Sequence, residues 1–257
     1  MKYSREALRK RRKKRVSKVK KKKLDIENRK TISVANSSDF RFIESYKLLR
    51  TNLTFSLSVT DECRKVLFTS SSSFEGKTTT AVNLAITLSE TGDKVLLIDA
   101  DMRKPMIHKY FNLESRKGLS NLISGMCGVE ESVQKVKDYP NLSIITAGAI
   151  PPNPSELLGS ESMRSLLERF EKQYNYIIID TPPINVVSDT LSIVNEVDGV
   201  AFVIRCGRST YPEVTRALET LKFANANILG AIINDDENGS RGYYDSYSYK
   251  YYRSTKI

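Results

Sequence analysis

The chain has 257 residues, 40% of them hydrophobic and 28% charged, which is enough for one well-packed α/β core. These proportions are those of a globular protein, and no apolar run approaches the roughly 18 residues that a membrane span requires. The N-terminus is rich in Lys and Arg and lacks the apolar stretch of a secretory signal, so we expect a cytoplasmic protein.

The net charge of +11 is unevenly distributed. Residues 1–30 hold 16 of the 41 basic residues and three of the 30 acidic residues, a net charge of +13, which leaves 25 bases and 27 acids, a net charge of −2, for the rest. Such a block is typical of a disordered arm, which we place at residues 1–34. The arm could touch an anionic membrane, bind nucleic acid without sequence preference, or have no dedicated partner.

A first helix is expected directly after the arm. Ser38-Asp39 is suited to cap a helix N-terminus, and apolar residues with helical spacings follow over residues 41–57. Glu44, Lys47 and Arg50 are spaced by three, which places them on one face of this helix. By themselves these three residues would be a solvated charged face.

The stretch from Ser71 to Thr78 reads Ser-Ser-Ser-Phe-Glu-Gly-Lys-Thr. It follows the apolar residues 66–68 and precedes the amphipathic residues 81–88, so a strand, a tight loop and a helix are expected in this order. This is the context of a P-loop, whose backbone amides and helix N-terminus hold phosphate oxygens. Lys77 would reach the β- and γ-phosphates, and the Thr78 hydroxyl would bind Mg²⁺. The match is incomplete, because Ser71 stands where the motif has its first glycine.

Carboxylates follow the next two apolar strands. Residues 94–98 read as a strand buried on both faces of a parallel sheet, and Asp99 and Asp101 come directly after it. Residues 176–179 are also apolar and end in Asp180, the pattern of a Walker-B strand whose carboxylate belongs to the Mg²⁺ shell. Ligands of parallel sheets bind at the carboxyl ends of the strands, so the three acids predict one site.

The remaining elements alternate between helix and strand. We expect a short helix within residues 118–125, a strand at 141–146, a helix from Ser155 to about residue 173, helical structure at 189–197, a strand at 199–205, a helix at 211–224 and a strand at 227–233 that is followed by Asn234. This alternation predicts an α/β fold of the P-loop NTPase type, with a mainly parallel, doubly wound sheet flanked by helices. The globular domain is placed at residues 35–235.

Residues 236–257 differ in character from the domain before them. Six of the 13 tyrosines fall within ten residues there: Tyr243, Tyr244, Tyr247, Tyr249, Tyr251 and Tyr252. The stretch has no Leu, Val or Phe with which the rings could pack in a core. We therefore expect a flexible tail whose phenols are modified or serve as stacking partners.

Taken together, these motifs resemble those of the bacterial tyrosine kinases of capsular and exopolysaccharide assembly. The resemblance rests on Gly76-Lys77-Thr78, on Leu-Leu-Ile-Asp-Ala-Asp-Met-Arg at 96–103 and on Ile-Ile-Ile-Asp-Thr-Pro-Pro at 177–183. Residues 118–120, residues 151–158 and the tyrosine cluster support it, so that it covers about residues 35–257.

The resemblance implies ATP-dependent autophosphorylation of the tail tyrosines, passed between subunits of a ring that the unphosphorylated protein forms. It also implies a transmembrane activator, a regulator of polysaccharide chain length whose cytoplasmic end helps complete the nucleotide site and holds the protein at the inner face of the membrane. A cognate tyrosine phosphatase would reverse the reaction. The activity would regulate polysaccharide polymerisation and export, and no specific nucleic acid is expected as a partner.

With ATP and Mg²⁺ as the expected cofactors, the site residues are assigned as follows. The predicted catalytic residues are Lys77, Asp99, Asp101 and Asp180, with Asp99 or Asp101 accepting the phenol proton. The predicted metal ligands are Thr78, Asp99 and Asp180. The predicted nucleotide-binding residues are Ser73, Phe74, Glu75, Gly76, Lys77, Thr78, Thr79, Arg103 and Asn234. Glu44, Lys47 and Arg50 resemble the family's E-x-x-R-x-x-R subunit-contact motif, with Lys47 in one arginine position.

Phe74 departs from the family pattern, which has a small residue, often glycine, before Glu75-Gly76. If the loop needs a positive φ there, phenylalanine costs about 1–3 kcal/mol. Two alternatives to a kinase therefore stay open. One is a switch ATPase without kinase activity, against which the lack of a second lysine between Ser70 and Glu75 counts. The other is a nucleotide-binding module, weakened by Phe74, that docks through its tyrosine tail.

Overall fold

The computed structural model describes residues 39–57 and 62–235, so the predicted arm, the predicted tail and all six tail tyrosines lie outside the described residues. The elements are α2 (Phe40–Ser56), β1 (Arg64–Ser70), α3 (Lys77–Ser89), β2 (Val95–Asp99), α4 (Ile107–Phe111), α5 (Leu119–Ile123), α6 (Val129–Ser132), β3 (Val133–Val136), β4 (Tyr139–Ile145), α7 (Pro154–Leu158), α8 (Glu161–Glu171), β5 (Tyr176–Asp180), η2 (Asp189–Ser192), η3 (Val194–Glu196), β6 (Gly199–Arg205), α9 (Tyr211–Phe223) and β7 (Ile228–Asn234). None of the helices described is both long and apolar enough to cross a bilayer.

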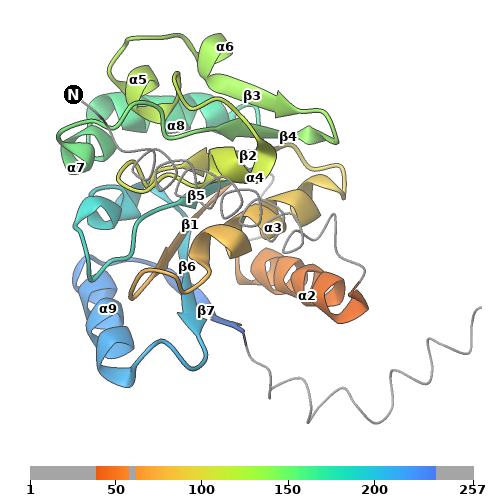
Figure 1. Ribbon diagram of the computed structural model, residues 1–257, viewed down its shortest axis with the longest axis vertical. Helices are drawn as coiled ribbons and strands as arrows, with labels where there is room; N and C mark the ends of the chain where they lie inside the picture. Colours follow the sequence, from red (N-terminus) through yellow and green to blue (C-terminus); the bar gives the residue numbers. More distant parts are fainter. Residues whose placement is uncertain (1–38, 58–61, 236–257) are drawn as a thin grey trace, which may run out of the picture.

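Within the described residues, seven strands form one sheet in the order β3-β4-β2-β5-β1-β6-β7 (Figure 1). Neighbouring strands are parallel except β3, which runs antiparallel to β4 at one edge. The prediction of a mainly parallel sheet flanked by helices is confirmed. The edge strand β3 was not predicted, because four partly exposed residues carry too little hydrophobic pattern to identify a strand.

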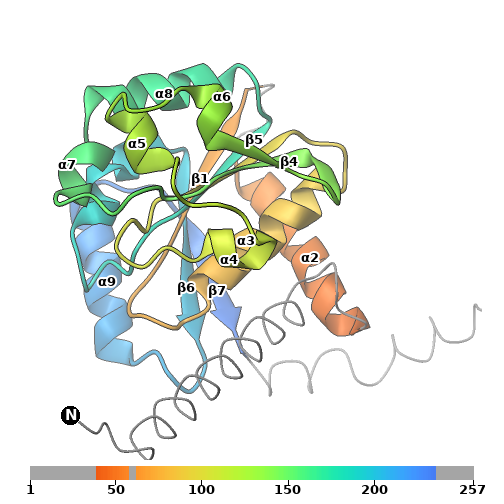
Figure 2. The same ribbon diagram turned by 45° about the horizontal axis from the view of Figure 1, so that its top comes forward.

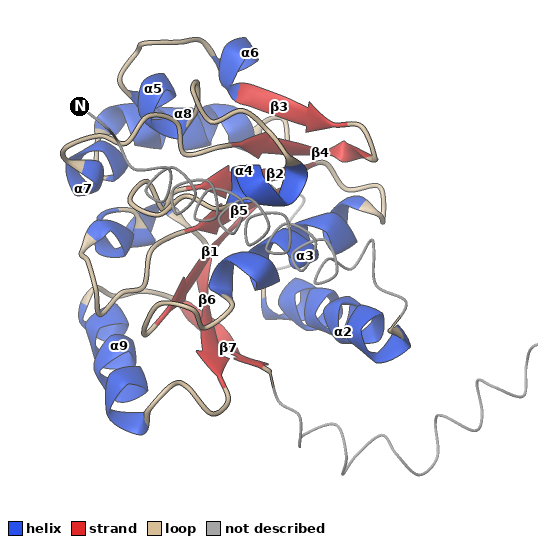
Figure 3. Ribbon diagram, in the orientation of Figure 1, coloured by secondary structure: helices blue, strands red, loops and turns tan. Residues whose placement is uncertain are grey.

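Helices cover both faces of the sheet, and Figures 2 and 3 show α2 and α3 separated from α8 and α9 by the strands. Successive residues of a strand point to opposite faces, so each central strand feeds two cores. Ile177 and Ile179 pack with residues of α8 and α9, whereas Ile178 packs with residues of α2 and α3. This double burial explains why β2 and β5 are apolar up to their last residue, Asp99 or Asp180.

Helix α2 confirms the predicted cap. The Asp39 carboxylate accepts a hydrogen bond from the Arg41 backbone N–H at 3.0 Å, which satisfies one of the free amides of the first turn. Tyr46 and Leu53 are buried, and α2 packs along α3. The helix thus covers the one that begins at the predicted P-loop.

The prediction of one helix from Ser155 to about residue 173 is wrong. Helix α7 ends at Leu158, and α8 begins after Ser160, whose hydroxyl accepts a hydrogen bond from the Met163 N–H as an N-cap. Ser155 does not cap α7; its hydroxyl donates to the Asp189 carboxylate instead. A capping serine next to Gly159 restarts the chain in a new direction, which the apolar periodicity alone did not reveal.

The predicted helical structure at 189–197 is confirmed. It consists of two short 3₁₀ helices, η2 and η3. The Thr190 hydroxyl is buried and donates to the Pro182 carbonyl oxygen, which ties the first of these turns to the end of β5. Both pieces have the short length that is usual for 3₁₀ helices.

The cap at Ser160 gives a direct test of the break between α7 and α8. We expect Ser160→Ala to lower the free energy of unfolding by about 1 kcal/mol, because the Met163 amide loses its side-chain acceptor and keeps only the Ser160 carbonyl oxygen. Urea denaturation measures this change. Ser165→Ala, the same substitution at an exposed interior position of α8, is the matched control and should stay within about 0.5 kcal/mol of the wild type. Equal effects of the two substitutions would contradict the cap.

Candidate active site

The parallel strands β2, β5 and β1 end at the same edge of the sheet, the one formed by the carboxyl ends of the strands. β5 lies between β2 and β1, and the register pairs Asp99 with Asp180 across β2 and β5. Both acids fall on the same alternation as Leu97 and Ile178, which pack against the α3 side. The two carboxylates therefore face the helix that begins with Lys77.

Lys77 and Thr78 both contact Asp180. The Lys77 ammonium lies 2.6 Å from Asp180 Oδ1, and the Thr78 hydroxyl donates to Asp180 Oδ2 at 2.7 Å. Lys77 and Asp180 are almost fully buried, so this is an ion pair shielded from water. Burial raises the pKa of Asp180, and the Lys77 ammonium with the two hydrogen bonds opposes that rise. The predicted P-loop lysine, metal-binding hydroxyl and Walker-B acid are in contact.

Asp99 is fully buried beside this pair. Its Oδ2 accepts hydrogen bonds from the backbone amides of Met106 and Ile107, each at 3.0 Å, whereas its Oδ1 has no hydrogen-bond partner. Burial raises the pKa of Asp99 to about 8, and the neighbouring Asp180 carboxylate adds to the rise. Asp101 is also largely buried at the same edge, and its Oδ1 accepts from the Lys104 amide at 2.9 Å.

This donor set suits Mg²⁺ bound together with phosphate. Two buried carboxylates share a single ammonium group, and one carboxylate oxygen has no partner, so a further cation would complete the charge balance. No group of three or more His, Cys, Asp or Glu side chains in the described part of the chain could hold a metal ion by itself. Mg²⁺ commonly uses one or two carboxylates together with substrate phosphates. Thr78, Asp180 and Asp99 are the residues that would hold it.

The P-loop backbone is fixed at Gly76 by close packing. Gly76 has φ of +91°, and a Cβ at this position would lie 1.9 Å from the Asn234 side-chain nitrogen. That nitrogen donates to the Glu75 carbonyl oxygen at 2.9 Å. Asn234 at the end of β7 therefore supports the loop backbone, and only glycine fits opposite it.

Glu75 was predicted to bind nucleotide, but its buried side chain is directed to the loop itself. The carboxylate accepts hydrogen bonds from the Ser72 N–H and the Ser71 hydroxyl, each at 2.7 Å, and from the Ser209 hydroxyl. Ser71, which replaces the first glycine of the motif, thus takes part in closing the loop. Thr79 is likewise committed to a protein contact, since its hydroxyl lies 2.5 Å from that of Tyr110.

Phe74 has a left-handed backbone, with φ of +70°, and its side chain is 76% exposed. The loop therefore does require a positive φ at this position, which costs about 1–3 kcal/mol for a residue with a side chain. The backbone carbonyl oxygens before and after the Phe74 Cα accept hydrogen bonds from two arginines. Arg208 donates to the Ser73 oxygen and Arg205 to the Phe74 oxygen, both at 3.0 Å.

The AAA domain family matches residues 74–229 of this chain. Tyrosine-protein kinase YwqD of Bacillus subtilis is 39% identical over 207 residues, which cover 80% of this chain and 86% of that protein. The chain belongs to the bacterial tyrosine kinase family. Putative tyrosine-protein kinase CapB of Staphylococcus aureus is 37% identical over 78% of this chain and 89% of its own length. The kinase domain of Escherichia coli tyrosine kinase ETK superposes with a TM-score of 0.71 at 35% identity, over 75% of this chain and 74% of that chain.

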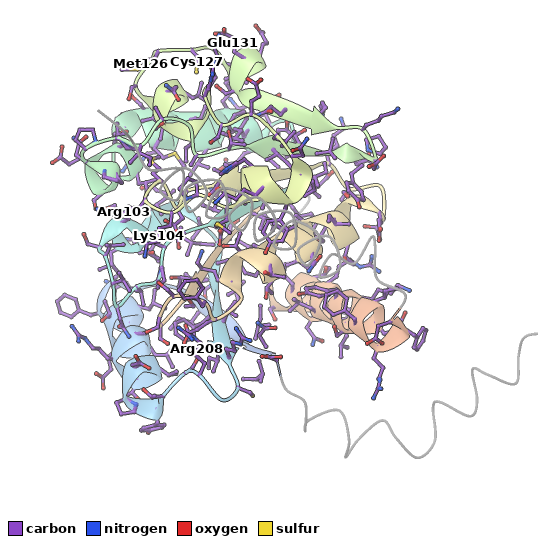
Figure 4. All side chains as sticks on the ribbon, in the orientation of Figure 1. Arg103, Lys104, Met126, Cys127, Glu131 and Arg208 are labelled. Atoms are coloured by element: carbon purple, nitrogen blue, oxygen red, sulfur yellow. The ribbon has the colours of Figure 1, made fainter. Side chains whose placement is uncertain are left out.

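Arg103 of the kinase lies on the loop after β2 (Figure 4), and its hydrogen bonds are to Asp189 rather than to the P-loop. Its guanidinium forms two hydrogen bonds with the buried Asp189 carboxylate, at 2.7 and 3.0 Å. Ser155 donates to the same carboxylate. The structure thus gives Arg103 a place in a network with η2 and α7, where the sequence assigned it to nucleotide.

The charged trio on α2 divides into two kinds of contact. Glu44 and Lys47 form an exposed ion pair at 2.7 Å, which leaves both on the outer surface of the helix. Arg50 instead donates to the Thr87 carbonyl oxygen near the end of α3, at 2.9 Å. A cation at a helix C-terminus is favourable, so Arg50 already has a role within its own chain.

Arg205, Arg208 and Ser209 were missed at the level of sequence. Arg205 is the last residue of β6, and the rule that ligands gather at strand ends, which identified Asp99 and Asp180, could have identified it as well. No sequence signal connects Arg208 or Ser209 with the P-loop, because their contacts span more than 130 residues of chain.

The raised pKa of Asp99 predicts a pH-dependent change in stability. A carboxyl that holds its proton more tightly when folded favours folding at acidic pH, and this contribution is lost as the pH rises from about 4 to about 8. Asp99→Asn removes the titration and keeps an acceptor for the Met106 and Ile107 amides. We expect it to raise the melting temperature of the nucleotide-free kinase at pH 8 by about 2–6 °C relative to wild type.

Thermal unfolding at pH 5 and pH 8 checks this prediction, and the gain should be clearly smaller at pH 5. Asp138→Asn, at an exposed position between β3 and β4, is the control and should show no such dependence. A gain from Asp99→Asn of the same size at both pH values would contradict the assignment.

Proposed function

We propose that this kinase transfers the γ-phosphate of ATP to the tyrosines of its own tail, from one subunit to another. The observation that carries the proposal is the Lys77–Asp180–Thr78 contact beside the unpaired oxygen of Asp99. These groups match a site for Mg·ATP. Asn234, the last residue of β7, contacts the P-loop, and the first of the acceptor tyrosines, Tyr243, follows it by nine residues along the chain.

The chemistry assigned to the chain is positioning and charge stabilisation. Lys77 and the loop amides would neutralise the phosphates, and Asp180 would hold both Lys77 and Thr78 in place. Bound Mg²⁺ would supply further positive charge at the phosphates. Asp99 or Asp101 would accept the proton of the phenol, whose pKa is about 10 in water. Asp99 must lose its own proton before it can do so.

The partners follow from the family to which the chain belongs. We propose that unphosphorylated chains form a ring through the α2 face with Glu44, Lys47 and Arg50. A transmembrane activator, a regulator of polysaccharide chain length, would bring the kinase to the inner face of the membrane and complete the nucleotide site. A tyrosine phosphatase would reset it. The cycle would regulate capsular or exopolysaccharide polymerisation and export.

A mixing experiment tests phosphorylation in trans. One full-length chain carries Lys77→Met and an intact tail; the other keeps Lys77 and has all six tail tyrosines changed to phenylalanine. With Mg·ATP and the cytoplasmic segment of the activator, we expect mass spectrometry to find phosphotyrosine on the Lys77→Met chain. That chain alone should be phosphorylated at least about 10²-fold more slowly than wild type, because Asp180 and the phosphates lose their cation.

Lys172→Met is the matched control and should leave the rate unchanged. Lys172 is exposed and precedes β5, so it lies toward the amino end of that strand, whereas the site is at the carboxyl end. If the mixture gives no tail phosphate while the wild-type chain is phosphorylated, the transfer occurs in cis. ATP hydrolysis without tail phosphate would favour the switch ATPase. Tight nucleotide binding with neither reaction would favour the docking module.

The basic arm is proposed to strengthen contact with anionic lipid. Residues 1–30 carry a net charge of +13, and each basic residue near an anionic surface contributes about 1 kcal/mol. We expect the full-length kinase to co-sediment with vesicles that contain phosphatidylserine, and a variant without residues 1–34 to bind at least about tenfold more weakly. Vesicles of phosphatidylcholine alone are the control. Equal binding of the two proteins would show that the arm does not contribute to lipid binding.

A further inference from the structure

The P-loop of this kinase contains a strained residue that its neighbours do not bury. Phe74 has φ of +70°, yet most of its side chain is exposed, so no core packing compensates for the left-handed backbone. A peptide with this strain would turn back to a negative φ in the absence of other contacts. Such a turn would move the amides that hold phosphate.

Two arginines hold this backbone from outside: Arg205, the last residue of β6, and Arg208, in the loop between β6 and α9. Arg208 Nε donates to the Ser73 carbonyl oxygen and Arg205 NH1 to the Phe74 carbonyl oxygen, each at 3.0 Å. The Arg208 guanidinium also lies 5.4 Å from the centre of the Phe74 ring, within cation–π distance. Figure 4 shows Arg208 on this loop, at the edge of the sheet that carries the P-loop.

Arg205 is itself anchored, and a chain of contacts continues from it to Glu75. Arg205 forms two hydrogen bonds with the Asp235 carboxylate, at 2.9 and 2.7 Å, and the Arg205 N–H donates to the Ser209 hydroxyl. Ser209 in turn donates to Glu75. The β6–α9 loop and the P-loop are therefore joined by contacts on both sides of Phe74.

We propose that Arg205 and Arg208 are positioning residues for ATP, which hold the strained P-loop in the conformation that binds phosphate. The pair offsets the presence of phenylalanine where the backbone conformation favours glycine. The inference rests on the proposed use of ATP but not on the identity of the phosphate acceptor. When only a fraction of the loops is competent, the apparent dissociation constant rises by the inverse of that fraction, while saturating ATP restores the complex.

The test is a double-mutant cycle on full-length kinase with Arg208→Ala, Phe74→Gly and the double variant. We expect Arg208→Ala to weaken binding of Mg·ATP about tenfold by calorimetry. The KM for ATP should rise by a similar factor, with kcat within about twofold of wild type. In the Phe74→Gly background, the same substitution should weaken binding by less than about threefold, because a glycine needs no clamp.

Arg216→Ala is the matched control, because it removes the same charge from an exposed position on α9 and leaves both loops intact. It should change ATP binding by less than about twofold. An equal loss from Arg208→Ala in both backgrounds, or no loss in either, would overturn the proposal. Calorimetry measures nucleotide binding without phosphate transfer, so failure of the autokinase proposal would leave this result interpretable.

Discussion

The constraint on which the site depends is the burial of Asp99 and Asp180 beside a single ammonium, that of Lys77. Buried charges are costly unless paired, and here two carboxylates compete for one cation. The protein resolves the competition unequally: Asp180 takes the ion pair, and the pKa of Asp99 rises to about 8. A ligand that brings positive charge would relieve this arrangement and would therefore bind to the folded state and stabilise it.

A second energetic cost at the same edge is the backbone strain of the P-loop. Phe74 and Gly76 both have positive φ, and the loop between them has no core of its own. It is held instead by side chains from elements distant in sequence, Asn234 from the end of β7 and Arg205 from the end of β6. A rigid sheet makes this possible, since strand ends keep their spacing while the loop carries the strain.

Helix α3 connects this edge to the other end of the molecule. It begins with Lys77, which pairs with Asp180, and near its end the Thr87 carbonyl accepts from Arg50 of α2. The face of α2 that carries Glu44 and Lys47 therefore lies on a helix fastened directly to the one that supplies the P-loop lysine. A protein bound to that face would therefore contact a helix that packs directly against α3.

The sequence by itself determined the fold class and the chemistry, because buried parallel strands leave long apolar runs and end in the polar groups of the site, as at Asp99 and Asp180. Such patterns involve residues that are close together in the chain, so they can be recognised in the sequence. The tertiary structure alone decided what those groups contact: that Asp99 keeps an oxygen unpaired, that Arg103 turns to Asp189, and that a serine at 160 divides one predicted helix into two. The support of Phe74 by Arg208 also needed the structure, because residues 134 positions apart meet only once the sheet brings β1 beside β6.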